Sequence, residues 1–324
     1  MVVEKAYSLC AGGKNLPLPC FFPSISSIKT NLRTADYLQL LKAVQHPLFL
    51  ISAYDIYNEI PGNQTIIKDL LTCLTGDGTV IFLDSGNYES YWKQDSNWTS
   101  EHFIQIVKCY PFHLAFCFDN QNPPSNASDL TREVIKTVVD NQQHTNSGTI
   151  IPIIHGLREL LPIAAKQVAK ELVPILLAIP ERVLGDGVIQ RAETVRKIRL
   201  SLDELGYYCP IHLLGTGNPL SILIYTLAGA DSYDGLEWCQ TVVDHKDGRL
   251  YHFQQWDFFR NQTAIGINEE IPFTHSVLSH NLVFYRKWLQ MINQALRDGS
   301  IKALVQEFLP KQFIEALRKI LPEI

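Results

Sequence analysis

The stretch Val80-Ile-Phe-Leu-Asp84-Ser-Gly86 is a short apolar run that ends in a carboxylate and a glycine. Apolar residues without strict alternation are typical of a parallel strand, because both of its faces are covered. Similar runs recur along the chain, at residues 19–24, 47–54, 113–119, 149–156, 173–180, 210–217 and 230–235. The sequence therefore predicts eight parallel strands.

Amphipathic stretches with helical spacing lie between these runs, at residues 36–44, 65–74, 101–109, 130–141, 157–172, 190–205 and 220–227. Eight strands that alternate with crossover helices indicate an α/β fold, a closed (β/α)₈ TIM barrel. Pro152 and Pro174 weigh against it, because a proline removes a hydrogen-bond donor from a strand. The last strand is also short and polar. A doubly wound open sheet is therefore the structural alternative.

The alternation stops after Gly235. Residues 236–274 are irregular and rich in Trp, Phe, Asp and Gln, which predicts an insertion over one end of the barrel. Two helices are expected next, at residues 276–297 and 301–321, because apolar residues recur there at helical spacing. We expect one TIM-barrel domain over residues 1–324, with the barrel core at about 19–235, the insertion at 236–274 and C-terminal helices at 275–324.

The composition is that of an ordinary globular protein, with 46% hydrophobic and 19% charged residues. The longest apolar runs, such as residues 47–51 and 173–179, are too short to span a bilayer. Residues 1–7 show no secretory signal. Seven scattered cysteines without a CxxC pair indicate reduced thiols and a cytoplasmic location.

The formal net charge is −5, which is not typical of a protein that coats nucleic acid. The part of the chain that follows His280 differs, because it contains seven Lys and Arg residues but only four acidic residues. This local positive excess suits a phosphate-bearing partner. A solvated helix face explains the same charges equally well.

Several strands end in a carboxylate or an imidazole: Asp84, Asp119, His155 and Asp234. The carboxyl ends of barrel strands meet at one mouth, where active sites lie. Acidic groups brought together there cost desolvation and repulsion, and chemistry is the usual reason for such an arrangement. Taken singly, each aspartate is more typical of a helix cap or turn, as we expect for Asp231. A lone His155 is more typical of a buried structural histidine.

Five segments, in the same order and with compatible spacing, resemble the tRNA-guanine transglycosylase family. LDSGNYE at residues 83–89 is similar to LDSGG(F/Y)Q, and AIPERVLGD at 178–186 to AIGGLAVGE. LLGTGNP at 213–219 is similar to LMGVGTP, GADSYDG at 229–235 to GVDMFDC, and HNLVFY at 280–285 to HNLxFY. The resemblance covers most of the chain.

This resemblance implies a TIM barrel that exchanges a nucleobase in two steps. Asp234 would attack the ribose C1′, expel guanine and form a covalent ester. Asp84 would then take a proton from the incoming 7-deazaguanine. Carboxylates can stabilise and trap an oxocarbenium-like state in this way, as in retaining glycosidases. Tyr88 would stack on the base and Asp119 would accept from it.

Further base-binding positions follow from the same resemblance. His155 and Gly156 stand where the family has a Gln-Gly pair that contacts the base. Glu181 and Arg182 replace the Gly-Gly-Leu-Ala segment that lines the base pocket. These two residues either read a different 7-substituent or pair with each other.

The chain departs from the family at the metal site. His280 matches a zinc-binding histidine, yet no cysteine occurs after Cys239. A structural zinc needs four ligands, so we expect no zinc and no other cofactor. The PTR-type segment after the nucleophile is also replaced, by residues 237–240.

The expected function is exchange of guanine for a 7-deazaguanine in a nucleic acid, with tRNA first, as in queuosine-type tRNA processing. The partners would be that nucleic acid and a free purine or 7-deazaguanine base, with no membrane. Dimers are common in the family, which makes a homodimer the expected assembly. The alternatives are a DNA-directed transglycosylase, a catalytically silent TIM-barrel accessory or binding subunit, and an enzyme of free nucleosides.

Overall fold

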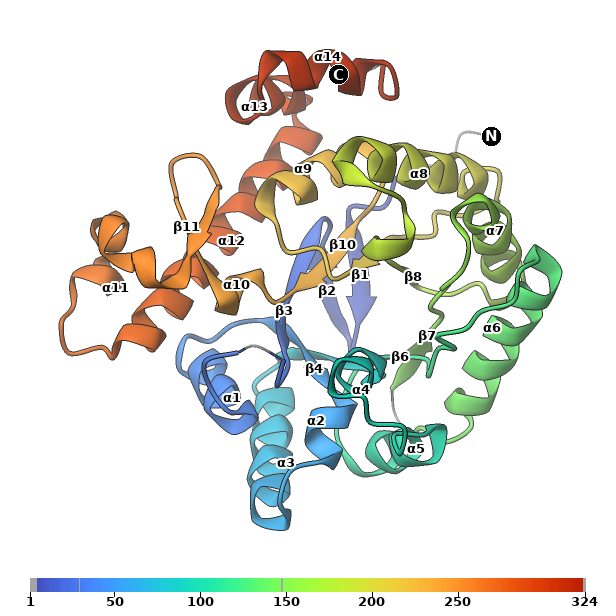
Figure 1. Cartoon of the computed structure of the whole chain (residues 1–324), viewed down its shortest axis with the longest axis horizontal. Coiled ribbons are helices and arrows are strands. Elements are labelled where there is room, and N and C mark those ends of the chain that lie inside the picture. The colour runs from blue at the N-terminus through green and yellow to red at the C-terminus, as the bar shows by residue number, and fades with distance from the viewer. Residues whose placement is uncertain (1–4, 29, 147, 323–324) are drawn as a thin grey trace.

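The computed structural model describes residues 5–28, 30–146 and 148–322, and its centre is a barrel of eight parallel strands (Figure 1). The strands are β3 (Cys20–Ile25), β4 (Leu48–Ser52), β5 (Val80–Asp84), β6 (Leu114–Phe116), β7 (Thr149–Ile151), β8 (Leu177–Pro180), β9 (Ile211–Leu214) and β10 (Ser232–Gly235). Their order in the sheet is β7-β6-β5-β4-β3-β10-β9-β8. All eight predicted strands are confirmed.

The two end strands of this sheet meet just beyond the carboxyl end of β7. The Ala178 N–H donates to the Pro152 carbonyl at 2.9 Å, and the Ile154 N–H donates to the Ala178 carbonyl at 2.8 Å. Pro152 is tolerated because only its carbonyl is needed at this seam. Pro174 precedes β8 and stands outside the ladder. The TIM barrel is therefore confirmed, and the open sheet is wrong.

Seven helices that the sequence predicted surround the barrel (Figure 1). They are α1 (Thr34–Ala43), α3 (Pro61–Gly76), α5 (Ser100–Cys109), α6 (Ala127–Gln142), α7 (Leu161–Leu172), α8 (Gly187–Leu202) and α9 (Pro219–Ala228). Local sequence sets their ends: Asn218 caps α9 by accepting from two backbone N–H groups, and Gly229 ends it at a φ of 114°. The short helices α2 (Ala53–Tyr57) and α4 (Asn87–Lys93) were not expected.

The interior of the barrel is filled with aromatic side chains rather than left open. The ring centroids of Phe22 and Phe82 are 5.3 Å apart, and those of Phe82 and Phe116 are 4.1 Å apart. Filling by bulky residues is usual for this architecture. His212 lies among these rings and is fully buried, which makes it the unusual member of the group.

An antiparallel hairpin that the sequence analysis missed covers the amino ends of the strands. It consists of β1 (Ser8–Ala11) and β2 (Lys14–Pro17). Gly12 at its tip lies against His113, which directly precedes β6, and Lys14 lies near Gly78, which precedes β5. Leu9 and Leu16 of the hairpin, and Leu18 directly after it, are buried. The hairpin thus leaves the opposite end of the barrel open.

The predicted insertion contains short elements, namely α10 (Glu237–Gln240), β11 (Thr241–Val243), β12 (Leu250–His252), the 3₁₀ turns η3 (Phe253–Phe258) and η4 (Arg260–Gln262), and α11 (Ala264–Ile267). Figure 1 shows that it extends mainly to the side of the barrel, beside α12 (Phe273–Arg297). The single helix expected over residues 301–321 is wrong. It is divided into α13 (Ile301–Phe308) and α14 (Lys311–Arg318) because Pro310 holds Leu309 in an extended conformation. The one-domain organisation stays a prediction.

Within the described residues, no helix has the length and apolar character that crossing a bilayer demands. The expectation of no secretory signal was based on residues 1–7. Residues 1–4 lie outside the described part of the chain. Glu323, one of the four acidic residues counted in the C-terminal part, is outside it as well.

Asp231 lies at the amino end of β10 and holds three elements together. Its carboxylate accepts from the Tyr208 hydroxyl at 2.7 Å and from the Ile211 N–H at 3.0 Å, and Arg199 lies 3.6 Å away. Arg199 and Asp231 are both buried. The structural role expected of Asp231 is therefore consistent with its contacts, although it ties strands and helix α8 together rather than capping a helix.

We expect Asp231→Asn to lower the free energy of unfolding by about 3 kcal/mol, because it removes the buried counter-charge of Arg199 and leaves only the partly exposed Asp203. Urea denaturation at neutral pH measures the change. Asp247→Asn is the control, since Asp247 is a partly exposed partner of Arg249. Equal stability of the two variants would show that the buried ion pair contributes nothing.

Candidate active site

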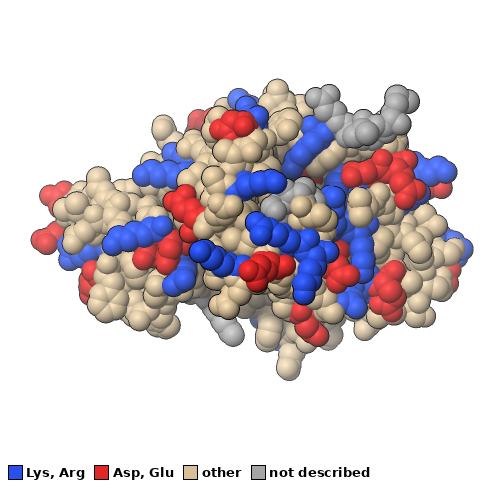
Figure 2. Space-filling model, turned by 90° about the horizontal axis from the view of Figure 1, so that it is seen from above, with Lys and Arg blue, Asp and Glu red and all other residues tan. Residues whose placement is uncertain are grey.

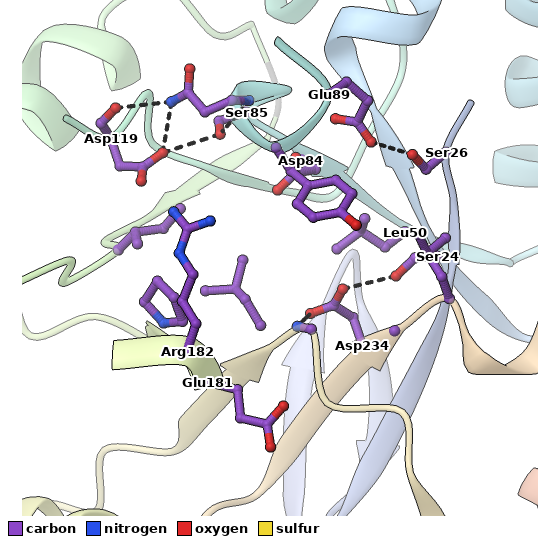
Figure 3. Close-up of a pocket in the computed structure, with 18 of the residues that line it drawn as sticks. Ser24, Ser26, Leu50, Asp84, Ser85, Glu89, Asp119, Glu181, Arg182 and Asp234 are labelled. Carbon is purple, nitrogen blue, oxygen red and sulfur yellow. Dashed lines mark hydrogen bonds between the residues drawn. The ribbon is translucent and has the colours of Figure 1, made fainter. Parts of the chain in front are cut away.

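A cavity of about 370 Å³ opens at the carboxyl ends of the strands (Figure 3). Six of the predicted site residues line it, each from the end of a strand or just beyond one: Asp84, Tyr88, Asp119, Glu181, Arg182 and Asp234. These residues are up to 150 positions apart in the chain. The convergence predicted from the strand ends is thus present in the structure.

Asp234 is a buried carboxylate with three hydrogen-bond donors. The Ser24 hydroxyl donates to Oδ2 at 2.8 Å, while the Gly215 N–H donates to Oδ1 at 3.1 Å. His212 Nε2 lies 3.0 Å from Oδ1. Such donors stabilise the ionised form of a carboxyl group. Asp234 is therefore well suited to act as a nucleophile.

Asp84 lies at the end of β5 in a poorer environment for charge. The Gly86 N–H donates to its Oδ2 at 2.9 Å. Burial, together with the nearby charges of Asp234 and Asp119, nevertheless raises the pKa of Asp84 to about 7. Figure 3 shows Asp84 and Asp234 at the same cavity. Two carboxyl groups with different protonation preferences can divide acid–base and nucleophilic work between them.

Gly86 explains the glycine in the segment that follows Asp84. Its φ is 82°, in the left-handed region, and a Cβ there would lie 2.6 Å from the Cβ of Tyr54. A residue with a side chain would therefore be strained and would clash. The tight turn places Asp84 and Tyr88 on the same cavity wall.

Asp119 is held by amide side chains. Asn87 Nδ2 donates to its Oδ1 at 2.7 Å, and Gln121 Nε2 donates to its Oδ2 at 2.7 Å. His155 Nδ1 is 3.5 Å from Asp119 Oδ2, but His155 lines a smaller pocket beside Asp119. Gly156 packs against Leu130. Neither His155 nor Gly156 lines the main cavity, and their contact with a base stays a prediction.

Glu181 and Arg182 do not bond to each other in the contacts that the structure describes. Glu181 Oε1 is 2.9 Å from Arg191 and accepts from the Tyr225 hydroxyl at 2.9 Å. Arg182 is exposed and donates to the Gln121 side chain at 2.6 Å. Each of the two residues thus has its own partners, and Arg182 is connected through Gln121 to Asp119.

Two further acidic residues line the cavity and were not singled out from the sequence. Glu89 is buried and accepts hydrogen bonds from the Ser26 and Ser52 hydroxyls. Its burial, together with the charges of Asp55 and Asp84, raises its pKa to about 8. Glu237 lies against Gly217 and Gly235, and burial raises its pKa to about 7. Both occupy positions where the chain departs from the family segments. That departure was the feature of the sequence that could have identified them.

The region around His280 does not fit the zinc site of the family. His280 Nε2 is 2.8 Å from the Val243 carbonyl, and Nδ1 is 3.3 Å from the Thr263 hydroxyl. Both ring nitrogens thus have protein partners. Across residues 5–28, 30–146 and 148–322, no group of three or more His, Cys, Asp or Glu residues could hold a metal ion.

Comparison with known proteins supports the resemblance seen in the motifs. No model of a protein family matches the chain. A tRNA-guanine(15) transglycosylase of Thermococcus onnurineus is 19% identical over 322 residues, which cover 91% of this chain and 53% of the relative. The enzyme of that name from Haloferax volcanii is 21% identical over 326 residues, which cover 93% of this chain and 61% of the relative. The tRNA-guanine(15) transglycosylase of Methanosarcina mazei is 21% identical over 286 residues, which cover 80% of this chain and 56% of the relative. The chain spans about half to three fifths of the length of these relatives.

We expect Glu89→Gln to change how stability depends on pH. The pKa of Glu89 is about 8 in the folded chain, against an ordinary value of 4.5, so the folded state keeps a proton that the unfolded state loses. Stability of the wild type therefore falls as pH rises from about 4.5 to about 8. Glutamine cannot ionise, so the variant should gain at least about 1 kcal/mol on the wild type over this range.

Urea denaturation at pH 5 and pH 9 measures this difference. Glu307→Gln is the control, because Glu307 is exposed on α13. Stability curves of Glu89→Gln and wild type that run parallel with pH would contradict the buried, proton-holding state of Glu89.

Proposed function

We propose that this chain, a divergent member of the tRNA-guanine transglycosylase family, exchanges a guanine base in tRNA for a 7-deazaguanine. The observation that carries the proposal is the pair Asp84 and Asp234, which line one cavity in different electrostatic environments. The printed names of the relatives supply the choice of tRNA and guanine. Because those relatives are longer than this chain, substrate and partner are part of the proposal.

In the first step, an oxygen of Asp234 bonds to the ribose C1′ while the bond from C1′ to the base breaks. The bonding electrons leave with guanine, which takes up the proton of the protonated Asp84 carboxyl group. In the second step, Asp84 accepts the ring N–H proton of the incoming base, whose nitrogen then attacks C1′ and releases the Asp234 carboxylate. A pKa of about 7 suits Asp84 to this exchange of protons near neutrality.

The cavity offers groups that suit a flat purine-like base. Tyr88 lies on α4 at the cavity wall, where its ring could stack on the base, and Asp119 could accept from the N–H edge. Glu181 and Arg182 line the wall opposite α4 and would select the 7-substituent. We assign His155 and Gly156 to supporting contacts around Asp119, because they lie beside it rather than in the cavity.

A nucleic acid must present its target base outside the helical stack before Asp234 can reach the sugar. Exposed aromatic side chains continue outward from Tyr88 on α4, with Tyr91 63% and Trp92 54% exposed. Such rings stack readily on unpaired bases. All seven Lys and Arg residues of the C-terminal helices are exposed, and Figure 2 shows many Lys and Arg, with Asp and Glu among them, on the face that these helices help to form.

The remaining expectations enter as part of this proposal. All seven cysteines are free, which agrees with a reducing cytoplasm as the site of the reaction. A free purine or 7-deazaguanine is the second substrate, and queuosine-type modification is the pathway class. A homodimer is the proposed assembly. Two buried carboxyl groups at one cavity speak against a catalytically silent subunit, since such a subunit has no use for them.

DNA-directed exchange is the second candidate function. The environment of His280 favours it, because the zinc segment that supports nucleic-acid docking in the family has no counterpart there. Nucleoside analysis of tRNA and DNA from cells with and without the gene distinguishes the two. A 7-deazaguanine lost from DNA alone would replace tRNA with DNA as the substrate. Activity on free nucleosides would exclude both polymers.

We expect Asp234→Asn to abolish base exchange, lowering the rate by about a thousandfold or more, because the amide cannot form the glycosyl ester. The measurement is incorporation of labelled guanine or 7-deazaguanine into tRNA, together with trapping of a covalent complex between protein and tRNA. Asp247→Asn is the matched control and should leave incorporation unchanged. Wild-type incorporation by Asp234→Asn would refute Asp234 as the nucleophile.

We expect Tyr88→Ala to raise the KM for the free base about tenfold, and Tyr88→Phe to leave it nearly unchanged. A stacked aromatic ring contributes roughly 1–3 kcal/mol per base, and phenylalanine keeps the ring. Steady-state kinetics with varied base concentration measures both variants. A loss of the same size in Tyr88→Phe would show that the hydroxyl, rather than the ring, binds the base.

A further inference from the structure

His212 is a histidine inside an otherwise aromatic and aliphatic barrel core. It lies on β9 and pairs in register with Ser232 on β10. It is fully buried, and the rings of Phe22, Phe82 and Phe116 surround it at centroid distances of 6.2, 5.6 and 5.1 Å. A polar group in such surroundings costs free energy unless each of its polar atoms has a partner.

Both ring nitrogens of His212 have partners. Nε2 is 3.0 Å from Asp234 Oδ1, and Nδ1 is 2.8 Å from the Ser232 hydroxyl oxygen. An ionised carboxylate can only accept, so the hydrogen must lie on Nε2. Nδ1 then accepts from the Ser232 hydroxyl, which in turn accepts from the Cys20 thiol at 3.4 Å. The donors thus run from Cys20 through Ser232 and His212 to Asp234.

The two oxygens of Asp234 are bound differently. Oδ1 accepts from two rigid donors, the His212 ring and the Gly215 backbone. Among the described residues, Oδ2 accepts only from the Ser24 hydroxyl, which can rotate away. Ser24, Gly215 and Asp234 line the cavity, whereas His212 does not. His212 can therefore reach a substrate only through Asp234.

We propose that His212 is a positioning residue that holds Oδ1 of Asp234 and leaves Oδ2 as the oxygen that attacks the sugar. The inference depends on the proposed base exchange for its consequence in the reaction. A phenylalanine would fill the same space among aromatic neighbours without polar atoms to satisfy. The histidine is therefore explained by what it donates rather than by packing.

The test compares His212→Phe with His212→Gln in the full chain. Phenylalanine removes the donor to Asp234, while the glutamine amide N–H can restore it. We expect His212→Phe to lower kcat by roughly tenfold to a hundredfold, the size usual for one hydrogen bond to a charged group, with little change in the KM for tRNA. His212→Gln should recover most of kcat. Equal kcat in wild type and His212→Phe, or no recovery in His212→Gln, would overturn the proposal.

His46→Phe is the matched control, because His46 is a buried histidine outside the cavity, and its kcat should equal that of the wild type. Crystal structures of wild type and His212→Phe give a readout without activity. The proposal expects the Asp234 carboxylate to turn away from the Gly215 N–H in the variant, and an unchanged carboxylate overturns it. If the wild type exchanges no base while the carboxylate turns in the variant, the proposed function fails but the positioning of Asp234 by His212 is supported.

Discussion

Two carboxyl groups at one cavity lie in different hydrogen-bonding environments, and much of the surrounding structure creates this difference. Asp234 receives donors from β3, from β9 and from the loop after β9, whereas the backbone donors to Asp84 come from its own turn. Part of the difference comes from the strand order, because β3 pairs with β10 and thereby brings Ser24 to Asp234.

The cavity is acidic beyond this pair. Glu89 and Glu237 add two carboxyl groups whose pKa values are raised to about 8 and about 7, so that much of each stays protonated near neutrality. Protonated carboxyl groups donate as well as accept, so they limit repulsion while still offering hydrogen bonds. Arg191 neutralises Glu181 at the far wall. The cavity therefore suits a ligand rich in N–H and O–H groups, such as a purine joined to a sugar.

The sequence predicted most of the scaffold, since apolar runs, helical spacing and the turn after Asp84 are local properties. The carboxylates were also predictable, because strand ends in a barrel share one mouth. The partners of those carboxylates were not. Ser24 and Asp234 are 210 positions apart, and His212 looks like any polar residue within an apolar run. The hairpin of β1 and β2 was missed for a similar reason, as its burial depends on the amino ends of distant strands. Pro310 was a local sign of a helix break, but the helical spacing of the apolar residues on both sides of it favoured one continuous helix.

Strand β10 shows how one short segment can separate stability from chemistry. Asp231 and Asp234 are three positions apart, and they lie at opposite ends of the strand. Asp231 meets a buried arginine, a tyrosine hydroxyl and a backbone N–H, which leaves its carboxylate fully engaged and away from the cavity. Asp234 faces the cavity with one oxygen bound by a single rotatable hydroxyl. Because the carboxyl ends of all eight strands face the same mouth, only the second aspartate can meet a substrate. The direction of the strand, rather than the residue type, thus decides which aspartate is available for chemistry.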